Sequence, residues 1–158
     1  MNKSSIHEKW MFKSIKQAEK AYAADEVPIG CVIVKDDLII GQGFNQVEQL
    51  NDATAHAEMI SITSAANYLD DWRLNDCSIY VTKEPCIMCF GAIVNSRIKN
   101  LYYGLEDLKN GFKIKVKDKY LLNNHLENIV SGIQQDQCKY LIEKFFKDKR
   151  KNNKETYK

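Results

Sequence analysis

The chain has 158 residues, of which 44% are hydrophobic, and its formal net charge is +2. This length suits one compact domain that buries roughly two-thirds of its unfolded surface. No apolar run approaches the roughly 18 residues of a membrane span, and the N-terminal stretch has too many lysines for a secretory signal. We therefore expect a single cytoplasmic domain over residues 1–150, with no membrane contact.

Positive charge is concentrated at the C-terminal end. Residues 147–158 include six Lys or Arg and two acidic residues, so the rest of the chain has a net charge of −2. We expect residues 151–158 to form a basic, flexible tail, because they offer little apolar surface to bury. A second basic stretch spans residues 109–119. Such runs are most often solvated surfaces, and the alternative is contact with a nucleic-acid phosphate backbone.

Helical and strand patterns alternate along the chain. In chain order they predict a helix over 5–24, a hairpin over 30–45, a helix over 55–69, a strand over 78–82, a helix over 85–96, a strand over 100–104, a weaker strand over 128–133 and a terminal helix that includes 138–146. The hairpin is expected to turn at Asp36 and Asp37. Thr54 is the predicted N-cap of the second helix, and Pro85 is expected in the first turn of the third. This alternation predicts a three-layer α/β/α sandwich around a central mixed five-stranded sheet.

Two of the five cysteines lie close together in the stretch EPCIMC, residues 84–89. An odd cysteine count argues against a disulfide framework. If a helix begins at Pro85, Cys86 and Cys89 project from the same side of its first turn. The positive end of the helix lowers the pKa of a thiol and so favours the thiolate, which is the form that binds metal. A thiolate pair suits zinc, and zinc normally takes four ligands.

His56 is the best candidate for a third ligand, because it too begins a helix. With Glu58 it completes the pattern H-x-E followed by P-C-x-x-C. Each half is weak alone, since an isolated C-x-x-C can be a redox dithiol and a lone histidine is usually a satisfied polar residue. Together they predict a catalytic zinc site with one position open to water, beside which Glu58 transfers protons. The alternative is a closed structural site that Cys31 completes.

The same motifs carry a resemblance to a known family. HAE and PCIMC resemble the signature of zinc-dependent nucleoside and nucleobase deaminases. The wider sequence is similar to bacterial tRNA-specific adenosine deaminases nearly from end to end, in segments such as DEVPIGCVIV, DATAHAEM, SIYVTKEPCIMCFGAIVNSRI and FFKDKR. The resemblance implies a cytidine-deaminase-like fold, one Zn²⁺ per subunit and a homodimer. It also implies hydrolytic conversion of the wobble adenosine to inosine in a tRNA anticodon stem-loop, with release of ammonia.

The resemblance also implies roles for individual residues. His56, Cys86 and Cys89 would bind zinc, and Glu58 would move protons between water and the base. The implied substrate contacts are Asn45, Ala57, Val27, Pro28, Asp107 and Lys109. From the residues alone, Asn45 fits a turn cap better. We add Arg150 as an RNA contact, because it lies on the basic end of the chain.

The sequence departs from the family pattern at two places. Lys83 precedes EPC, where the family generally has leucine or another uncharged residue, and residues 112–123 replace a run of small residues. Both departures affect the expected RNA contacts and leave the zinc chemistry unchanged. Elsewhere, Phe145 and Phe146 lie on the apolar face of the terminal helix and are predicted to pack in the core. His7 and His125 are assigned to surface or capping positions.

Two other functions stay open at the level of sequence. A deaminase of a free base, guanine or cytosine, has the same zinc motif. A non-catalytic zinc module that binds RNA would show no turnover in any form. The basic C-terminal end favours an RNA substrate, because a free base has no phosphate chain to hold.

Overall fold

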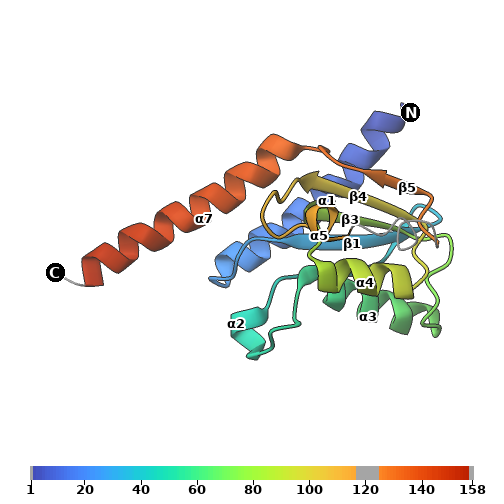
Figure 1. The fold of residues 1–158 in the computed structure, drawn as a ribbon, viewed down its shortest axis with the longest axis horizontal. Helices are drawn as coiled ribbons and strands as arrows, with labels where there is room; N and C mark the ends of the chain where they lie inside the picture. Colours follow the sequence, from blue (N-terminus) through green and yellow to red (C-terminus); the bar gives the residue numbers. More distant parts are fainter. Residues whose placement is uncertain (1, 117–124, 157–158) are drawn as a thin grey trace.

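The computed structural model describes residues 2–116 and 125–156 and has three layers (Figure 1). The helices are α1 (Lys3–Ala23), α2 (Val47–Leu50), α3 (Ala57–Leu69), α4 (Ile87–Asn95), α5 (Phe112–Lys115) and α7 (Gln135–Thr156). The strands are β1 (Gly30–Lys35), β2 (Leu38–Phe44), β3 (Ser78–Lys83), β4 (Asn100–Leu105) and β5 (Asn128–Val130). Helices α1 and α7 lie on one side of the sheet, and α3 and α4 lie on the other. The predicted α/β/α sandwich is confirmed. Residues 117–123 of the divergent segment and 157–158 of the tail lie outside the described residues.

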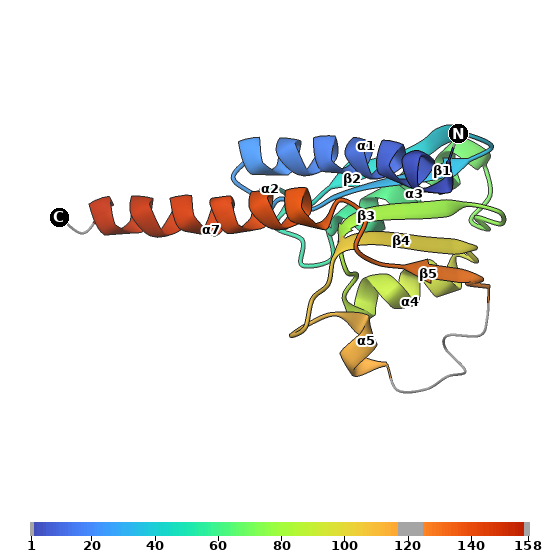
Figure 2. The ribbon, with the colours of Figure 1, turned by 90° about the horizontal axis from the view of Figure 1, so that it is seen from above.

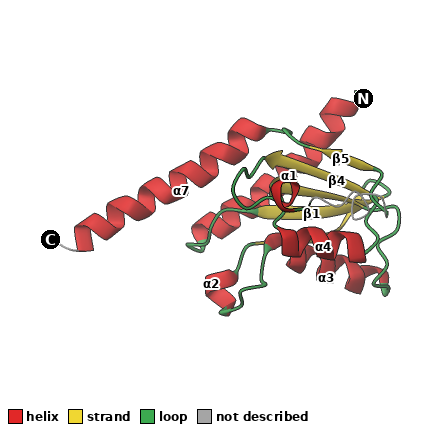
Figure 3. Ribbon diagram, in the orientation of Figure 1, coloured by secondary structure: helices red, strands yellow, loops and turns green. Residues whose placement is uncertain are grey.

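The sheet is mixed and has five strands in the order β2-β1-β3-β4-β5. It lies between the helices of the two outer layers (Figure 3). Strand β1 is antiparallel to β2 and β3, whereas β3, β4 and β5 are parallel to one another. Asp36 and Asp37 form the hairpin turn with φ values of 49° and 58°. Two positive φ values match the turn to the right-handed twist of the strands, and aspartate tolerates this conformation better than most residues.

The two faces of the sheet build two separate cores. Because successive side chains of a strand point to opposite faces, Cys31 and Ile33 of β1 pack in the core beneath α3 and α4, while Val32 and Val34 pack in the core beneath α1. The second core also holds Trp10, Met11 and Ile15 of α1, Tyr80, Tyr102 and Cys138. Each face of the sheet therefore packs against helices, which fixes the strand ends on which the site is built.

His7 is more than a surface residue. Its ring stacks on Tyr102 with centroids 4.2 Å apart, and its Nδ1 lies 2.9 Å from the hydroxyl oxygen of Tyr80. His7 is half-buried, so it lies at the surface as predicted, and two strand tyrosines contact its ring. His125 is exposed, as predicted.

Two predicted helix starts are corrected by the structure. Helix α3 begins at Ala57 with His56 as its N-cap, because the Thr54 hydroxyl donates instead to Asp52 Oδ1 at 2.7 Å. Pro85 is not in the first turn of α4, which begins at Ile87 with Cys86 as its N-cap. Residues 85–86 are extended because they pair with the segment before α5: the Phe112 N–H donates to the Pro85 carbonyl, and Cys86 forms a bridge with Gly111.

The terminal helix continues beyond its predicted packed part. Helix α7 extends to Thr156, and its C-terminal part projects away from the sheet (Figure 2). The side chains of residues 151–154 are exposed, in agreement with a segment that has little to bury. The flexibility of residues 151–158 stays a prediction. None of the helices in the described part of the chain has the length and apolar character needed to cross a bilayer.

Candidate active site

Three metal-ligating side chains converge where α3 and α4 begin. His56 Nδ1 lies 3.6 Å from Cys86 Sγ and 3.4 Å from Cys89 Sγ. Zinc bonds of about 2.3 Å to sulfur and 2.0–2.1 Å to nitrogen in a tetrahedron place such atoms about 3.5 Å apart. The three ligand atoms all lie within 4.8 Å of one another, so the residues fit a zinc ion. We call His56, Cys86 and Cys89 the metal centre.

Cys31 is not part of this group. Among the described residues, the histidines, cysteines and carboxylates placed to share one ion are the three of the metal centre. Cys31 is fully buried in β1, where desolvation raises the pKa of its thiol well above the usual value. The closed site that Cys31 would complete is therefore not formed, and Cys31 serves as core packing.

Hydrogen bonding lowers the pKa of Cys86 in the metal centre and so favours its thiolate. The hydrogen bond with Cys89 and the nearby His56 lower the pKa of Cys86 to about 3, against the opposing effect of burial. The same hydrogen bond, together with burial, raises the pKa of Cys89. The hydrogen bond with Cys86 also raises the pKa of His56. Cys86 is thus a thiolate at neutral pH, in the form that binds a metal.

Glu58 is a buried carboxyl beside the metal centre. It lies in the first turn of α3, is only 4% exposed and lines the cavity. Burial raises the pKa of Glu58, although the nearby His56 opposes the shift. A carboxyl whose pKa is moved toward neutrality can both accept and donate a proton.

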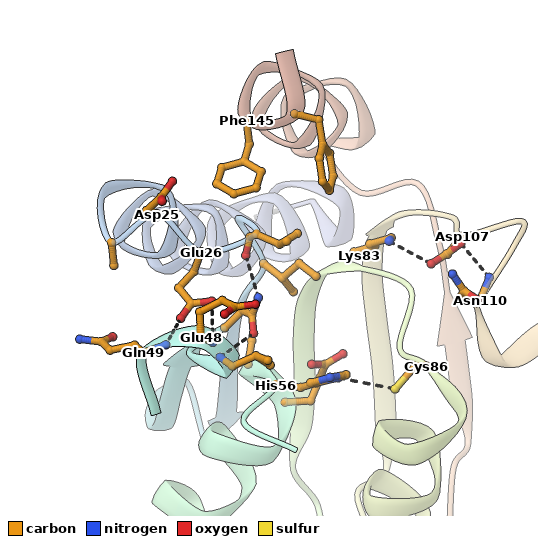
Figure 4. Close-up of a pocket in the computed structure, with 18 of the residues that line it drawn as sticks. Asp25, Glu26, Glu48, Gln49, His56, Lys83, Cys86, Asp107, Asn110 and Phe145 are labelled. Atoms are coloured by element: carbon orange, nitrogen blue, oxygen red, sulfur yellow. Dashed lines mark hydrogen bonds and ion pairs between the residues drawn. The ribbon is translucent and has the colours of Figure 1, made fainter. Parts of the chain in front are cut away.

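The metal centre opens into a cavity of about 1000 Å³ (Figure 4). Its walls come from the segment between α1 and β1, from α2, from the end of β3, from the segment after β4 and from α7. We call Lys83, Asp107, Phe146 and Lys149 the rim. All four line the same cavity, the first two from the end of β3 and the segment after β4, and the last two from α7. A cavity of this volume can hold a nucleoside with part of its strand.

Some of the expected substrate contacts line the cavity and others do not. Val27, Asn45, Ala57 and Asp107 line the cavity. Asn45 joins two of its walls: its Nδ2 donates to the Val27 carbonyl at 3.2 Å, and its Oδ1 accepts from the Val47 N–H at 3.3 Å. It is therefore both a turn cap and a lining residue.

The other expected contacts do not line the cavity. Pro28 is buried behind the wall, and Lys109 and Arg150 are exposed outside it. Phe146, predicted to be core, is 44% exposed and lines the cavity. Phe145 lines the cavity too, but it is 6% exposed and packs against Tyr22, so it is core as predicted. The helical pattern placed both phenylalanines on one face but did not show that α7 runs across the cavity.

Two buried carboxylates that the sequence did not single out hold the walls. Glu26 accepts the N–H groups of Glu48 and Gln49 at 3.3 and 2.6 Å, which fixes α2. Glu84 accepts the N–H groups of Asp107 and Lys113 at 2.9 and 3.0 Å, which fixes the segment after β4. Gly111 makes room for Glu84, since a Cβ there would lie 2.4 Å from its carboxylate. No local pattern marks these residues, because their partners lie more than twenty positions away.

An ion pair closes one side of the rim. Lys83 Nζ lies 2.9 Å from Asp107 Oδ2, and the two side chains are 28% and 13% exposed. Asp107 Oδ1 accepts the N–H groups of Lys109 and Asn110 at 3.0 and 2.9 Å. Both oxygens of Asp107 are thus engaged, so the carboxylate is fixed in position.

Comparisons with known proteins agree with one another. The MafB19-like deaminase family matches residues 5–150. A tRNA-specific adenosine deaminase of Haemophilus influenzae is 39% identical over 156 residues, which cover 96% of this chain and 90% of the relative. That of Buchnera aphidicola is 41% identical over 150 residues and covers 94% of this chain and 99% of its own.

Solved structures show the same fold. A structure from a study of A-to-I editing by tRNA:A34 deaminases at the wobble position of transfer RNA has a TM-score of 0.77 and 36% identity, and it covers 84% of this chain and 98% of its own. A guanine deaminase from Bacillus subtilis has a TM-score of 0.61 and 41% identity, but it covers 67% of this chain and 66% of its own.

Proposed function

This chain belongs to the tRNA-specific adenosine deaminase family, and we propose that it uses His56, Cys86, Cys89 and Glu58 to convert adenosine to inosine at the wobble position of a tRNA anticodon loop. The observation that carries the proposal is the convergence of one imidazole nitrogen and two sulfurs at 3.4–3.6 Å beside a buried carboxyl.

The three residues of the metal centre would hold one Zn²⁺ per subunit. Zinc with three protein ligands and an open position activates water near neutral pH. The donor set of one nitrogen and two sulfurs, with Cys86 already a thiolate, is the kind that zinc prefers. His56 and Cys86 are the N-caps of α3 and α4, and Cys89 lies in the first turn of α4, so two helix starts present the three side chains.

Glu58 moves the protons of the reaction. Water adds to C6 of adenine, and ammonia leaves after the exocyclic nitrogen is protonated. Glu58 accepts a proton from the attacking water and delivers it to N1 of the base, and the second proton of that water passes to the exocyclic nitrogen before ammonia leaves. The burial of Glu58 beside the metal centre excludes bulk solvent from this proton transfer. Its raised pKa suits both the acceptance and the donation of the proton.

The cavity walls orient the base. Asn45 and Val27 line the cavity, and Ala57 begins α3, where the N–H groups have no acceptor within the helix. A base that reaches the metal centre must leave its stack, which costs least in a single-stranded loop. The anticodon loop supplies such a base. Asp107 is assigned to the strand that carries this base, and Lys109 and Arg150 to more distant parts of the RNA, since they lie outside the cavity.

We expect the enzyme to act as a homodimer in the cytoplasm, where its tRNA substrate is found. Apolar side chains on the layer of α3 and α4 support an assembly, because Tyr68, Trp72 and Ile87 are each more than half exposed. Light scattering after gel filtration measures the mass of the particle, and a monomer at micromolar concentration would contradict this part of the proposal.

The decisive experiment compares substrates. The zinc-loaded protein should form inosine in a short RNA hairpin with a wobble adenosine, with release of one ammonia per inosine. The similarity to a guanine deaminase makes deamination of a free base the alternative function, so free guanine, cytosine and adenine are tested in parallel. Turnover of free guanine without turnover of RNA would favour the alternative function. Hairpin binding without turnover of any substrate would favour the non-catalytic zinc module.

A further inference from the structure

The lining of the cavity is poor in positive charge. Its described residues include six carboxylates, which are Asp25, Glu26, Glu48, Glu58, Glu84 and Asp107. The lysines of the same lining are Lys83 and Lys149. A nucleic-acid strand brings one negative charge per nucleotide into this acidic surface. The strand therefore requires specific cations at the places where its phosphates enter.

The two lysines differ in how firmly they are held. Lys149 pairs with Asp25, and the two side chains are 40% and 74% exposed. Such exposed pairs contribute little and are easily rearranged. Lys83 and Asp107 are 28% and 13% exposed, and Asp107 is itself fixed by the N–H groups of Lys109 and Asn110. The ammonium of Lys83 is therefore preorganised at the rim.

Lys83 also lies near the metal centre. It ends β3 and is three positions before Cys86, a separation that spans at most about 10 Å. Its side chain reaches across to Asp107 above Cys86 (Figure 4). An ammonium has three N–H donors, so the contact with Asp107 Oδ2 engages only part of its capacity. Lysine binds phosphate as a compact point charge.

We propose that Lys83 is a further substrate-binding residue, whose ammonium, positioned by Asp107, contacts a backbone phosphate of the RNA strand next to the deaminated nucleotide. The inference rests on the proposed RNA substrate. It assigns Asp107 a second task, which is to position Lys83 and to keep its ammonium from pairing with the buried carboxylates of the cavity.

The test measures binding, so that it is independent of turnover. A fluorescent anticodon hairpin is titrated with zinc-loaded protein in a Glu58→Ala background at several salt concentrations, and anisotropy gives the Kd. Lys83→Leu should weaken binding about 3- to 10-fold at low salt. It should also make the plot of log Kd against log salt shallower by about 0.7, which is the value for one phosphate contact with a single strand. Lys83→Arg should restore most of the affinity and of the slope.

Matched variants separate this role from a structural one. Lys99 pairs with Asp76 and Glu127 at the opposite end of the sheet, so Lys99→Leu removes the same charge and should leave the Kd within about twofold. Asp107→Asn keeps the charge of Lys83 but removes the carboxylate that positions it, so the salt slope should fall by less than it does in Lys83→Leu. Equal losses in Lys83→Leu and Asp107→Asn with unchanged slopes would overturn the proposal, as would a Lys83→Leu protein that binds like wild type.

The outcomes for the proposed function are distinct. If the protein with Glu58 intact binds the hairpin but forms no inosine, the proposal of tRNA deamination is wrong. The salt dependence of Kd for Lys83→Leu then still tests the phosphate contact. If inosine forms and Lys83→Leu has no effect on Kd or slope, only the role of Lys83 fails.

Discussion

The metal centre and the rim of the cavity are built by different means. His56, Cys86 and Cys89 lie at the starts of two helices, and a short motif in the sequence marks each start, although the two motifs are 30 positions apart. At the rim, Lys83 meets Asp107 across two neighbouring strands, and Phe146 reaches the cavity from the last helix. The groups that carry the chemistry are thus recognisable from local motifs, whereas the residues of the rim have no such motif and are found only in the folded chain.

Loss of a metal ligand should have the largest effect. Cys86→Ala removes the thiolate of the metal centre and should abolish zinc binding and lower deamination at least about 1000-fold, because activated water is lost. Metal analysis and inosine detection measure both effects. Cys31→Ala is the matched control, since it removes a buried thiol outside the metal centre and should retain one zinc per chain. Loss of zinc in the Cys31 variant would mean that Cys31 is a ligand.

Glu58→Gln should separate chemistry from metal binding. The amide fills the same space but cannot accept the proton, so kcat should fall by about 10²- to 10⁴-fold. Zinc content should be unchanged, because Glu58 is not one of the three ligands. Single-turnover rates on the anticodon hairpin give the result, and a variant that retains more than about a tenth of the wild-type rate contradicts the role of Glu58.

Substitutions of the two phenylalanines of α7 distinguish a residue of the core from a residue of the rim. Phe145→Ala should lower the free energy of unfolding by about 3 kcal/mol, since a buried ring that packs against Tyr22 is lost. Phe146→Ala should lower it by less than about 1 kcal/mol but weaken hairpin binding, because its exposed ring lines the cavity. Urea unfolding and anisotropy measure these quantities. Equal destabilisation by both variants would place Phe146 in the core after all.

A smaller effect is expected where a carboxylate holds the rim. Glu84→Gln replaces one acceptor oxygen with a donor facing a backbone N–H, which should cost about 1–3 kcal/mol of unfolding free energy and speed hydrogen exchange of the Asp107 N–H. Glu106→Gln is the control on the same segment. Its pair with Lys113 is nearly half exposed on both sides, so the cost should stay below about 0.5 kcal/mol. A Glu84 variant as stable as the control would show that the rim is held by other contacts.

The fold was predictable wherever a local pattern decided it. Helical spacing, β-branched runs and the Asp36-Asp37 turn predicted the layers and the hairpin correctly. The start of α4 was predicted two residues early, because the bridge between Cys86 and Gly111 keeps the chain extended after Pro85. Propensity cannot foresee a partner that lies 25 positions further along the chain.

The site residues were also predictable only where a local pattern marked them. The sequence identified His56, Glu58, Cys86 and Cys89, and the structure brings them together. It did not find Glu26 or Glu84, whose buried carboxylates accept backbone N–H groups of distant segments. A glutamate with such a role has no local signature, because its neighbours in sequence are not its neighbours in space.

X-ray absorption at the zinc edge tests the central claim most directly. For the protein purified with zinc, the account predicts one zinc per chain with two sulfur neighbours at about 2.3 Å and two nitrogen or oxygen neighbours at about 2.0–2.1 Å, one of them from solvent. A third sulfur in the coordination shell, or a protein that is folded and active with no zinc, would contradict it.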